Sequence, residues 1–337
     1  MSKTVFVSGA NGFIASHTVG LLLDQGYTVI GSVRSEAKGA SFKKALKTDK
    51  FSYVVIPNIA DVGAFDNVLK ENPQISAFLH IASPFRFNVE SPENDILIPA
   101  IEGTRNVLNS IKKYAPQITR VVITSSDCAA RENDDRDPSI VLDESVWSKA
   151  TFESSKHDLV PAYLGSKPLA EKLAWDFVKN EKPNFKLVTV LPSYTFGPQL
   201  TDELVSPDLN NSSKVIESIL QSTPESVLHN HTGSWIDVRD AAKAHIVALQ
   251  SDEAVNQRLI LSSSRFTSQT ITDIIIKDFP QYKGKIFEGV PGADVEEVKT
   301  FQTLNYSKTN NILGFKFIPI KKTVDDSVSQ LLRVRGA

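Results

Sequence analysis

The sequence predicts a doubly wound, parallel α/β sheet with a smaller domain that is mostly C-terminal. Short apolar runs alternate with helical patterns through residues 1–192, the first run ends in a glycine-containing turn that opens a helix, and the alternation then breaks down. Strands separated by helices are typical of parallel sheets, whose ligands lie beyond the carboxyl ends of the strands. We therefore expect the functional residues where the apolar runs end.

The composition narrows the class of protein. The chain has 337 residues, a formal net charge of −2 and 23% charged residues, which give no electrostatic reason to expect a nucleic acid or a membrane as partner. Cys128 is the only cysteine, so an internal disulfide is excluded and a reducing compartment is favoured. No run has the length of a bilayer span, and the opening residues fit a strand better than a secretion signal. We expect a cytoplasmic monomer or homodimer whose partner is a small molecule.

The first strand and turn predict a dinucleotide site. Residues 4–8 form an apolar run that ends in Gly9-Ala10-Asn11-Gly12-Phe13-Ile14-Ala15, and an amphipathic helix follows as far as Gly26. Strand, glycine turn and helix are the context of a Rossmann fingerprint, in which glycines let the backbone approach a pyrophosphate and the helix N-terminus faces its charge. The spacing here is G-x-x-G-x-x-A. The residues expected to contact the cofactor at this turn are Gly9, Asn11, Gly12, Phe13 and Ile14.

The end of the second strand indicates which dinucleotide is bound. Residues 27–34 end in Ser32-Val33-Arg34, and Lys38 follows. A chain that binds NAD usually carries Asp or Glu near this point, for the ribose hydroxyls. A carboxylate would repel a 2′-phosphate, whereas a guanidinium can pair with it through two hydrogen bonds. The sequence therefore favours NADP(H); the alternative is that Arg34 simply faces solvent and the selectivity is set elsewhere.

The later elements continue this rhythm and then depart from it. The helix expected over residues 95–114 should be kinked or begin late at Pro99. Further strands are expected at 53–56, 77–82, 120–126 and 185–191, with a return strand at 258–262. Helices are expected at 63–71, around Tyr163 and Lys167 as far as about residue 179, after Asp240 as far as residue 250, near 270–279 and near 321–332. The expected division is a nucleotide-binding domain of residues 1–192, to which 235–262 return, and a cap over 193–337 that mainly binds substrate.

Tyr163 and Lys167 are spaced as i and i+4 on a predicted helix, so they share one face about 5–6 Å apart at Cβ. An unperturbed tyrosine, with a pKa of about 10, is too weak an acid at neutral pH. A positive charge about 4 Å away contributes roughly 4 kcal/mol at an effective dielectric of about 20, which would lower that pKa. Such a phenol can protonate an oxygen. The spacing alone also fits an incidental pair on a surface helix.

The ordered motifs resemble those of the extended short-chain dehydrogenase/reductase family. They are the loop of residues 7–15, His80-Ile81-Ala82-Ser83-Pro84, the helix around Gly103-Thr104-Arg105-Asn106-Val107-Leu108, the Tyr163/Lys167 pair and residues 236–245. The resemblance covers nearly the whole chain. It is closest to the branch that holds dihydroflavonol and cinnamoyl-CoA reductases and the yeast methylglyoxal and aldehyde reductases.

The resemblance implies a role for each matching residue. Tyr163 would be the general acid, Lys167 would lower its pKa and bind the nicotinamide ribose, and Ser126, with Ser125 as the fallback, would hold the carbonyl oxygen. Arg34, with Ser32 and Lys38, would bind the adenosine phosphate. The remaining cofactor contacts implied are Asn58, Ile59, Ala82, Pro192 and Ser193, and the substrate walls implied besides Ser126 and Tyr163 are Phe85, Tyr194 and Phe196.

Two departures from the family pattern affect specificity. Asn58-Ile59 stands where the family often has an Asp beside the adenine. After Ser126 the relatives tend to show apolar or aromatic residues, whereas this chain has Asp127 and Cys128, with Arg131 where a large apolar wall is expected. Two charges at the rim would alter the choice of substrate.

The sequence thus predicts an NADPH-dependent reductase of aldehydes, ketones or α-dicarbonyls such as methylglyoxal. One alternative is an NAD(P)-dependent epimerase or dehydratase on the same scaffold, against which Arg34 argues. The other is a sensor that binds NADP(H) without catalysis, which need not retain serine, tyrosine and lysine together. No metal is expected, because His229 and His231 have no cysteine or carboxylate beside them in the sequence.

Overall fold

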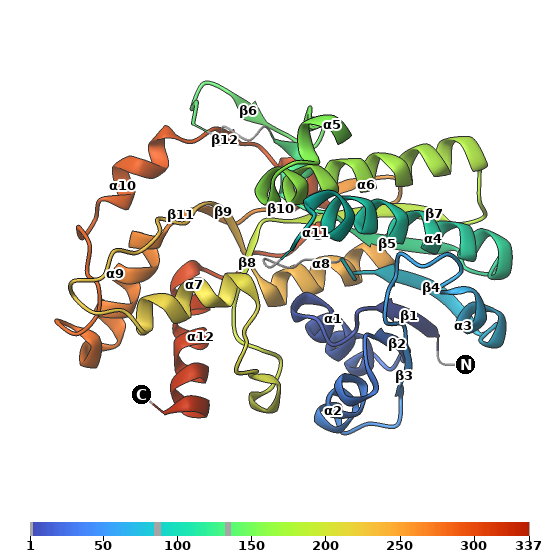
Figure 1. Cartoon of the computed structure of the whole chain (residues 1–337), viewed down its shortest axis with the longest axis horizontal. Coiled ribbons are helices and arrows are strands. Elements are labelled where there is room, and N and C mark those ends of the chain that lie inside the picture. The colour runs from blue at the N-terminus through green and yellow to red at the C-terminus, as the bar shows by residue number, and fades with distance from the viewer. Residues whose placement is uncertain (1–2, 84–88, 132–135, 337) are drawn as a thin grey trace.

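The computed structural model describes residues 3–83, 89–131 and 136–336. Its main sheet has seven parallel strands in the order β10-β7-β5-β4-β1-β2-β3 (Figure 1). In chain order this is the 3-2-1-4-5-6 arrangement of a dinucleotide-binding sheet with one further strand, which confirms the predicted fold class. The strands are β1 Thr4–Ser8, β2 Thr28–Val33, β3 Phe51–Val55, β4 Ile75–His80, β5 Arg120–Thr124, β7 Lys186–Pro192 and β10 Arg258–Leu261.

Helices cover both faces of this sheet. On one face α1 Phe13–Asp24 packs against α8 Val238–Gln250, and their small and branched apolar residues form one core with β1, β7 and β10. On the other face α3 Asp66–Glu71, α4 Ile98–Tyr114 and α6 Leu159–Glu181 enclose a second core with β4 and β5. Burial on both faces explains why these strands are nearly continuous apolar runs.

Three of the observed elements lie next to the strand ends and can be compared with the expected ones. Helix α2 Glu36–Leu46, which the sequence reading did not identify, connects β2 to β3. Strand β4 ends at His80, so residues 81–83 lie beyond it as a strand-end loop. The helix before β5 begins as a π-helical turn, Glu93–Leu97, and continues as α4 with Pro99 as its second residue, in agreement with the late start expected at Pro99.

A second, smaller arrangement follows β7. Strands β8 Tyr194–Phe196, β9 Thr232–Asp237 and β11 Ser264–Thr267 form a three-stranded sheet in the order β11-β9-β8. Helices α7 Asn211–Leu220, α9 Ser268–Asp278 and α12 Ile320–Arg335 contribute to its core. The shorter elements are β6 Val141–Leu142, which pairs with β12 Thr303–Leu304, and helices α5 Phe152–Ser155, α10 Asp294–Glu297 and α11 Ser307–Leu313.

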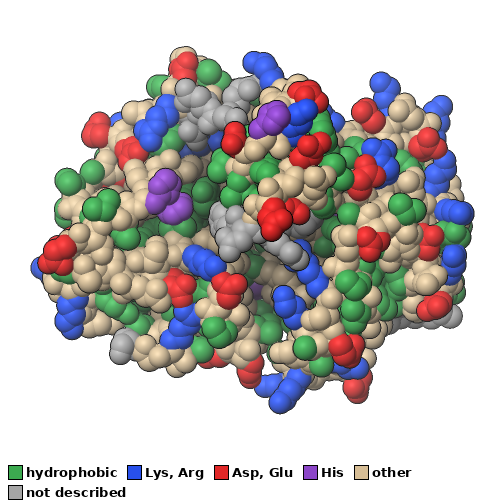
Figure 2. All heavy atoms as spheres, viewed as in Figure 1, with side chains coloured by type: hydrophobic (Ala, Val, Ile, Leu, Met, Phe, Trp, Pro, Cys, Tyr) green, Lys and Arg blue, Asp and Glu red, His purple; other side chains and the backbone are tan. Residues whose placement is uncertain are grey.

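Surface charge is mixed on the face drawn in Figure 2, where Lys and Arg side chains lie beside Asp and Glu. Within the described part of the chain, no helix has the length and apolar character needed to cross a membrane.

Candidate active site

The glycine turn is shaped for close approach by a ligand. Gly9 has φ +64°, and a Cβ built there would lie 3.0 Å from the Cβ of Ala82. The amide of Gly12 donates to the carbonyl of Gly9 at 2.8 Å, and Gly12 is the exposed N-cap of α1, without a side-chain cap. Ser32 Oγ accepts the amide of Gly9 at 3.1 Å, so Ser32 holds the turn in place. Glycine at position 9 is therefore required both by its conformation and by the neighbouring chain.

Ser8, which the sequence reading passed over, fixes the ends of two strands. Its hydroxyl accepts the amides of Ile81 and Ala82, each at 3.0 Å, and lies 2.9 Å from His80 Nδ1. Because both acceptor positions are occupied, the hydroxyl proton is left for Nδ1. Burial, assisted by the charge of Lys167, lowers the pKa of His80 to about 4, so the ring is neutral. The sequence did carry a signal for this contact, because Ser8 and His80 are the polar residues that end two apolar strands.

The residues expected at the adenosine end lie around the ends of β2 and β3. Arg34 directly follows β2 and is exposed, and Lys38 is exposed on the first turn of α2. Asn58 lies in the loop after β3, where its amide donates to Asp61 Oδ1 at 2.6 Å. Asn106 of α4 donates to the carbonyl oxygens of that loop, including that of Ile59, and the nearest is Ala60 at 2.8 Å. The loop is thus held by a helix residue that we had not assigned.

Tyr163 and Lys167 lie on one face of α6, with Lys167 Nζ 5.2 Å from the centre of the tyrosine ring. Lys167 is buried and donates to Ser83 Oγ at 2.6 Å. Burial lowers the pKa of Lys167 to about 8. Ser83 was not among the expected residues, because its partner is 84 positions away in the sequence.

The pKa of Tyr163 differs from the simple expectation. Burial raises the pKa of Tyr163 above its usual range, and the neighbouring Cys128 and Asp127 act in the same direction. Desolvation of the phenolate therefore exceeds the effect of nearby positive charge. Tyr163 consequently carries its proton at neutral pH.

Ser126 follows β5 and caps the short 3₁₀ helix η2, Asp127–Ala130, by accepting the amide of Cys128. Its hydroxyl is 3.2 Å from Asp127 Oδ1. Ser125, the fallback, instead donates to Glu171 at 2.8 Å. Helix α6 packs directly against η2, which brings the Ser126 segment to the helix of Tyr163 and Lys167. This arrangement favours Ser126 over Ser125 as the serine that meets a carbonyl.

The two unexpected charges beside Ser126 pair with each other. Arg131 Nε lies 3.4 Å from Asp127 Oδ2, and both side chains are largely buried. Cys128 Sγ lies 3.6 Å from Asp127 Oδ1 and 3.9 Å from Arg131 Nη2, and burial raises the pKa of its thiol. The segment after Ser126 therefore presents an ion pair whose two charges offset each other, together with the protonated thiol of Cys128.

The remaining expected residues, at the end of β7 and in the substrate walls, have different outcomes. Pro192 ends β7 and Ser193 follows it; the Ser193 hydroxyl and amide both donate to the Leu261 carbonyl, at 2.8 and 3.2 Å, so their contact with a cofactor stays a prediction. Tyr194 is 37% exposed, and its role as a substrate wall stays a prediction. Phe196 was wrongly assigned: its side chain has no exposed surface and packs against Phe266 in the core of the small sheet. Phe85 lies outside the described residues.

These residues fit NADP(H). The Gly9 turn has a face that a Cβ would fill, the N-terminus of α1 is uncapped by side chains, and Arg34 and Lys38 supply positive charge at the end of β2. Backbone amides at a helix N-terminus suit a pyrophosphate, and cationic side chains suit a 2′-phosphate.

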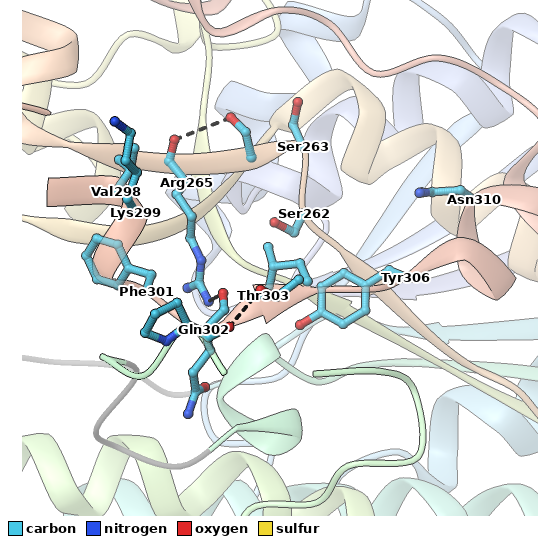
Figure 3. A pocket seen from close by; sticks show the side chains of 13 residues that line it. Ser262, Ser263, Arg265, Val298, Lys299, Phe301, Gln302, Thr303, Tyr306 and Asn310 are labelled. Carbon is cyan, nitrogen blue, oxygen red and sulfur yellow. Dashed lines mark hydrogen bonds between the residues drawn. The ribbon is translucent and has the colours of Figure 1, made fainter. Parts of the chain in front are cut away.

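A cavity of about 420 Å³ lies at the carboxyl end of β10. Figure 3 shows Ser262, Arg265, Gln302 and Tyr306 among the side chains that line it. Ser126, Tyr163 and Lys167 do not line this cavity, so the reacting carbonyl is not placed in it.

The fold and the serine, tyrosine and lysine set define a nicotinamide-dependent enzyme of the Rossmann class. The chain belongs to the NAD dependent epimerase/dehydratase family, whose model matches residues 5–261. GRP2 of Candida albicans is 49% identical over 337 residues, covering 98% of this chain and 99% of that protein. The NADPH-dependent methylglyoxal reductase GRE2 of Saccharomyces cerevisiae is 46% identical over 342 residues, covering 99% of each.

A solved structure agrees with these sequence relatives. Yeast methylglyoxal/isovaleraldehyde reductase Gre2, complexed with NADPH, superposes with a TM-score of 0.96 at 45% identity over 99% of both chains. The resemblance inferred from the sequence motifs is thereby confirmed.

Proposed function

We propose that the protein is an NADPH-dependent reductase of small carbonyl compounds: aldehydes, ketones and α-dicarbonyls of the methylglyoxal kind. The observation that carries this is the placement of Tyr163 and Lys167 on one face of α6, packed against the segment that Ser126 begins. The yeast relative supports the same chemistry: GRE2 is named an NADPH-dependent methylglyoxal reductase, and the yeast Gre2 structure was solved with NADPH.

Each side chain then has a distinct task. The cofactor supplies a hydride to the carbonyl carbon. Ser126 holds the carbonyl oxygen through its hydroxyl, and Tyr163 donates its proton to that oxygen, so that an alcohol results. Lys167 stabilises the tyrosinate left behind and binds the nicotinamide ribose. Arg34, Lys38 and the amides of the Gly9–Ile14 turn hold the phosphates.

An epimerase or dehydratase is the second candidate, because the family model carries that name. Such enzymes retain NAD and usually an acidic residue after the second strand, whereas this chain has the exposed Arg34 there. A sensor without catalysis would need neither the buried Lys167 nor the proton held on Tyr163.

Three finer assignments accompany the proposal. The cofactor domain comprises residues 1–192 with the return of 235–262, and the rest of 193–337 forms most of the substrate side. The single cysteine fits a cytoplasmic location. The enzyme acts as a ketoreductase as well as an aldehyde reductase, as a monomer or homodimer.

The test is to mix the protein with NADPH or NADH and a panel of aldehydes, ketones and α-dicarbonyls, and to follow cofactor absorbance. We expect oxidation of NADPH with at least one carbonyl, and much slower oxidation of NADH. Binding of NADPH without turnover of any carbonyl would support the sensor instead, and tightly retained NAD would support the epimerase.

A further inference from the structure

A buried carboxylate connects the two halves of the catalytic set. Glu171 lies on α6 four residues after Lys167, and its side chain has no exposed surface. Its Oε2 accepts Ser125 Oγ at 2.8 Å, and its Oε1 accepts Thr189 Oγ1 at 2.8 Å. Residues at i and i+4 share a helix face, so the face that presents Tyr163 and Lys167 is bonded through Glu171 to the residue just before Ser126.

Arg258 of β10 holds the other end of the same segment. Its Nε donates to Glu171 Oε1 at 2.8 Å, and its Nη2 donates to the carbonyl of Ala129 at 3.1 Å. Its Nη1 donates to the carbonyl of Val146 at 2.6 Å, and the guanidinium lies 3.6 Å from the centre of the Trp147 ring. Every group of this fork is therefore directed at a defined partner.

We propose that Glu171 and Arg258 are positioning residues that set the place of Ser126 relative to Tyr163. Ser125 and Ala129 flank the Ser126 turn, and the ion pair fixes both. This inference rests on the proposed function, because it assumes that Ser126 and Tyr163 act on one carbonyl oxygen.

The energetics of buried ion pairs favour a positional role over a purely stabilising one. Removing two charges from water costs about as much as their attraction returns, so such a pair is weak support for stability. The hydrogen bonds of the Glu171–Arg258 pair do, however, hold the two side chains and their partners in one arrangement. A misplacement of about 1 Å in a reacting group can cost up to about 100-fold in rate.

The experiment is a double-mutant cycle on Ser125 and Ser126. Ser125→Ala removes the bond from Glu171 to the strand end but leaves every charge in place. We expect Ser125→Ala to lower kcat about tenfold, within the range for a misplaced group, with the KM for NADPH little changed. In a Ser126→Ala background the same substitution should lower kcat less than twofold, because residues that act through one another are not additive.

Thr189→Val is the matched control. Thr189 is buried and donates to the same carboxyl group at the same 2.8 Å, but it lies on β7, beside Ile123 of β5, and is not part of the segment 125–129 that carries Ser126. Ser125→Ala and Thr189→Val should lower the thermal stability by similar amounts. Thr189→Val should keep kcat within twofold of wild type, whereas Ser125→Ala should not. Arg258→Lys, which keeps the charge and loses the fork, should lower kcat as Ser125→Ala does.

Equal effects of Ser125→Ala and Thr189→Val on kcat, or an undiminished effect of Ser125→Ala in the Ser126→Ala background, would overturn the positioning role and leave the reductase proposal intact. A wild-type protein that reduces no carbonyl would overturn both.

Discussion

The ammonium of Lys167 lies 5.2 Å from the centre of the Tyr163 ring and donates a 2.6 Å hydrogen bond to Ser83, three residues after the end of β4. The lysine therefore joins the acid on α6 to the strand end beside the glycine turn. Since the turn and the phenol belong to different elements, this one side chain would connect the proposed cofactor site to the proposed proton donor.

Tyr163→Phe tests the proton donor. We expect kcat to fall by about 10²–10⁴-fold, the usual contribution of a general acid, with NADPH affinity largely retained. Single-turnover reduction of a carbonyl, alongside titration of NADPH binding, measures both. Near-wild-type turnover in this variant would remove Tyr163 from the mechanism.

The pH dependence tests Lys167. Burial lowers its pKa to about 8, from an ordinary value of 10.5. Because the cation is the active form, its population falls as the pH rises through about 8, and kcat/KM for NADPH should fall about tenfold per pH unit above it. The matched variant is Lys167→Arg, whose guanidinium stays charged; its residual activity should lack this alkaline limb. A wild-type profile that is flat to pH 10 would contradict the assignment.

Arg34→Glu tests the choice of nucleotide. A carboxylate at this exposed strand end would repel the 2′-phosphate, so the Kd for NADPH should rise far more than that for NADH. Lys47→Glu, an exposed charge reversal at the far end of α2, is the control for a general change of surface charge. Equal weakening of both cofactors by Arg34→Glu would show that this residue does not read the phosphate.

Gly9→Ala tests the turn. A left-handed conformation costs a residue with a Cβ roughly 1–2 kcal/mol, and the added methyl group would also press on Ala82. We expect lower thermal stability and at least tenfold weaker NADPH binding. Gly26→Ala, with φ +83° and open space around its Cβ, should lose stability with unchanged NADPH binding. Similar cofactor affinity in both variants would contradict a specific role for Gly9.

Tyr194 and Phe196 test which aromatic residue meets the substrate. Phe196→Ala should destabilise the protein by about 3–5 kcal/mol, the cost of emptying a buried aromatic site. Tyr194→Ala, at a partly exposed position, should change the KM for bulky carbonyls with a smaller loss of stability. Urea unfolding and steady-state kinetics separate these outcomes, and a large stability loss in the Tyr194 variant would argue that it too is core.

Local patterns predicted most of this fold. The Gly9 turn, the helix of Tyr163 and the return strand at 258–262 each carry their signal within a few consecutive residues. Phe196 shows where this fails, because strand alternation reveals that a side chain is buried but not whether core or ligand covers it. Ser83 and Arg258 were missed because their partners, Lys167 and Glu171, lie 84 and 87 residues away.

Strand β10 imposes an order on synthesis and folding. On its outer side β7 pairs with residues 256–261, so this edge of the sheet stays open until the ribosome has added some 65 residues beyond β7, roughly three to thirteen seconds of elongation. During that time β7 presents an apolar edge of the kind that recruits other chains. A fragment that stops at residue 192 should therefore aggregate, and a nascent chain of that length is a natural client for a chaperone.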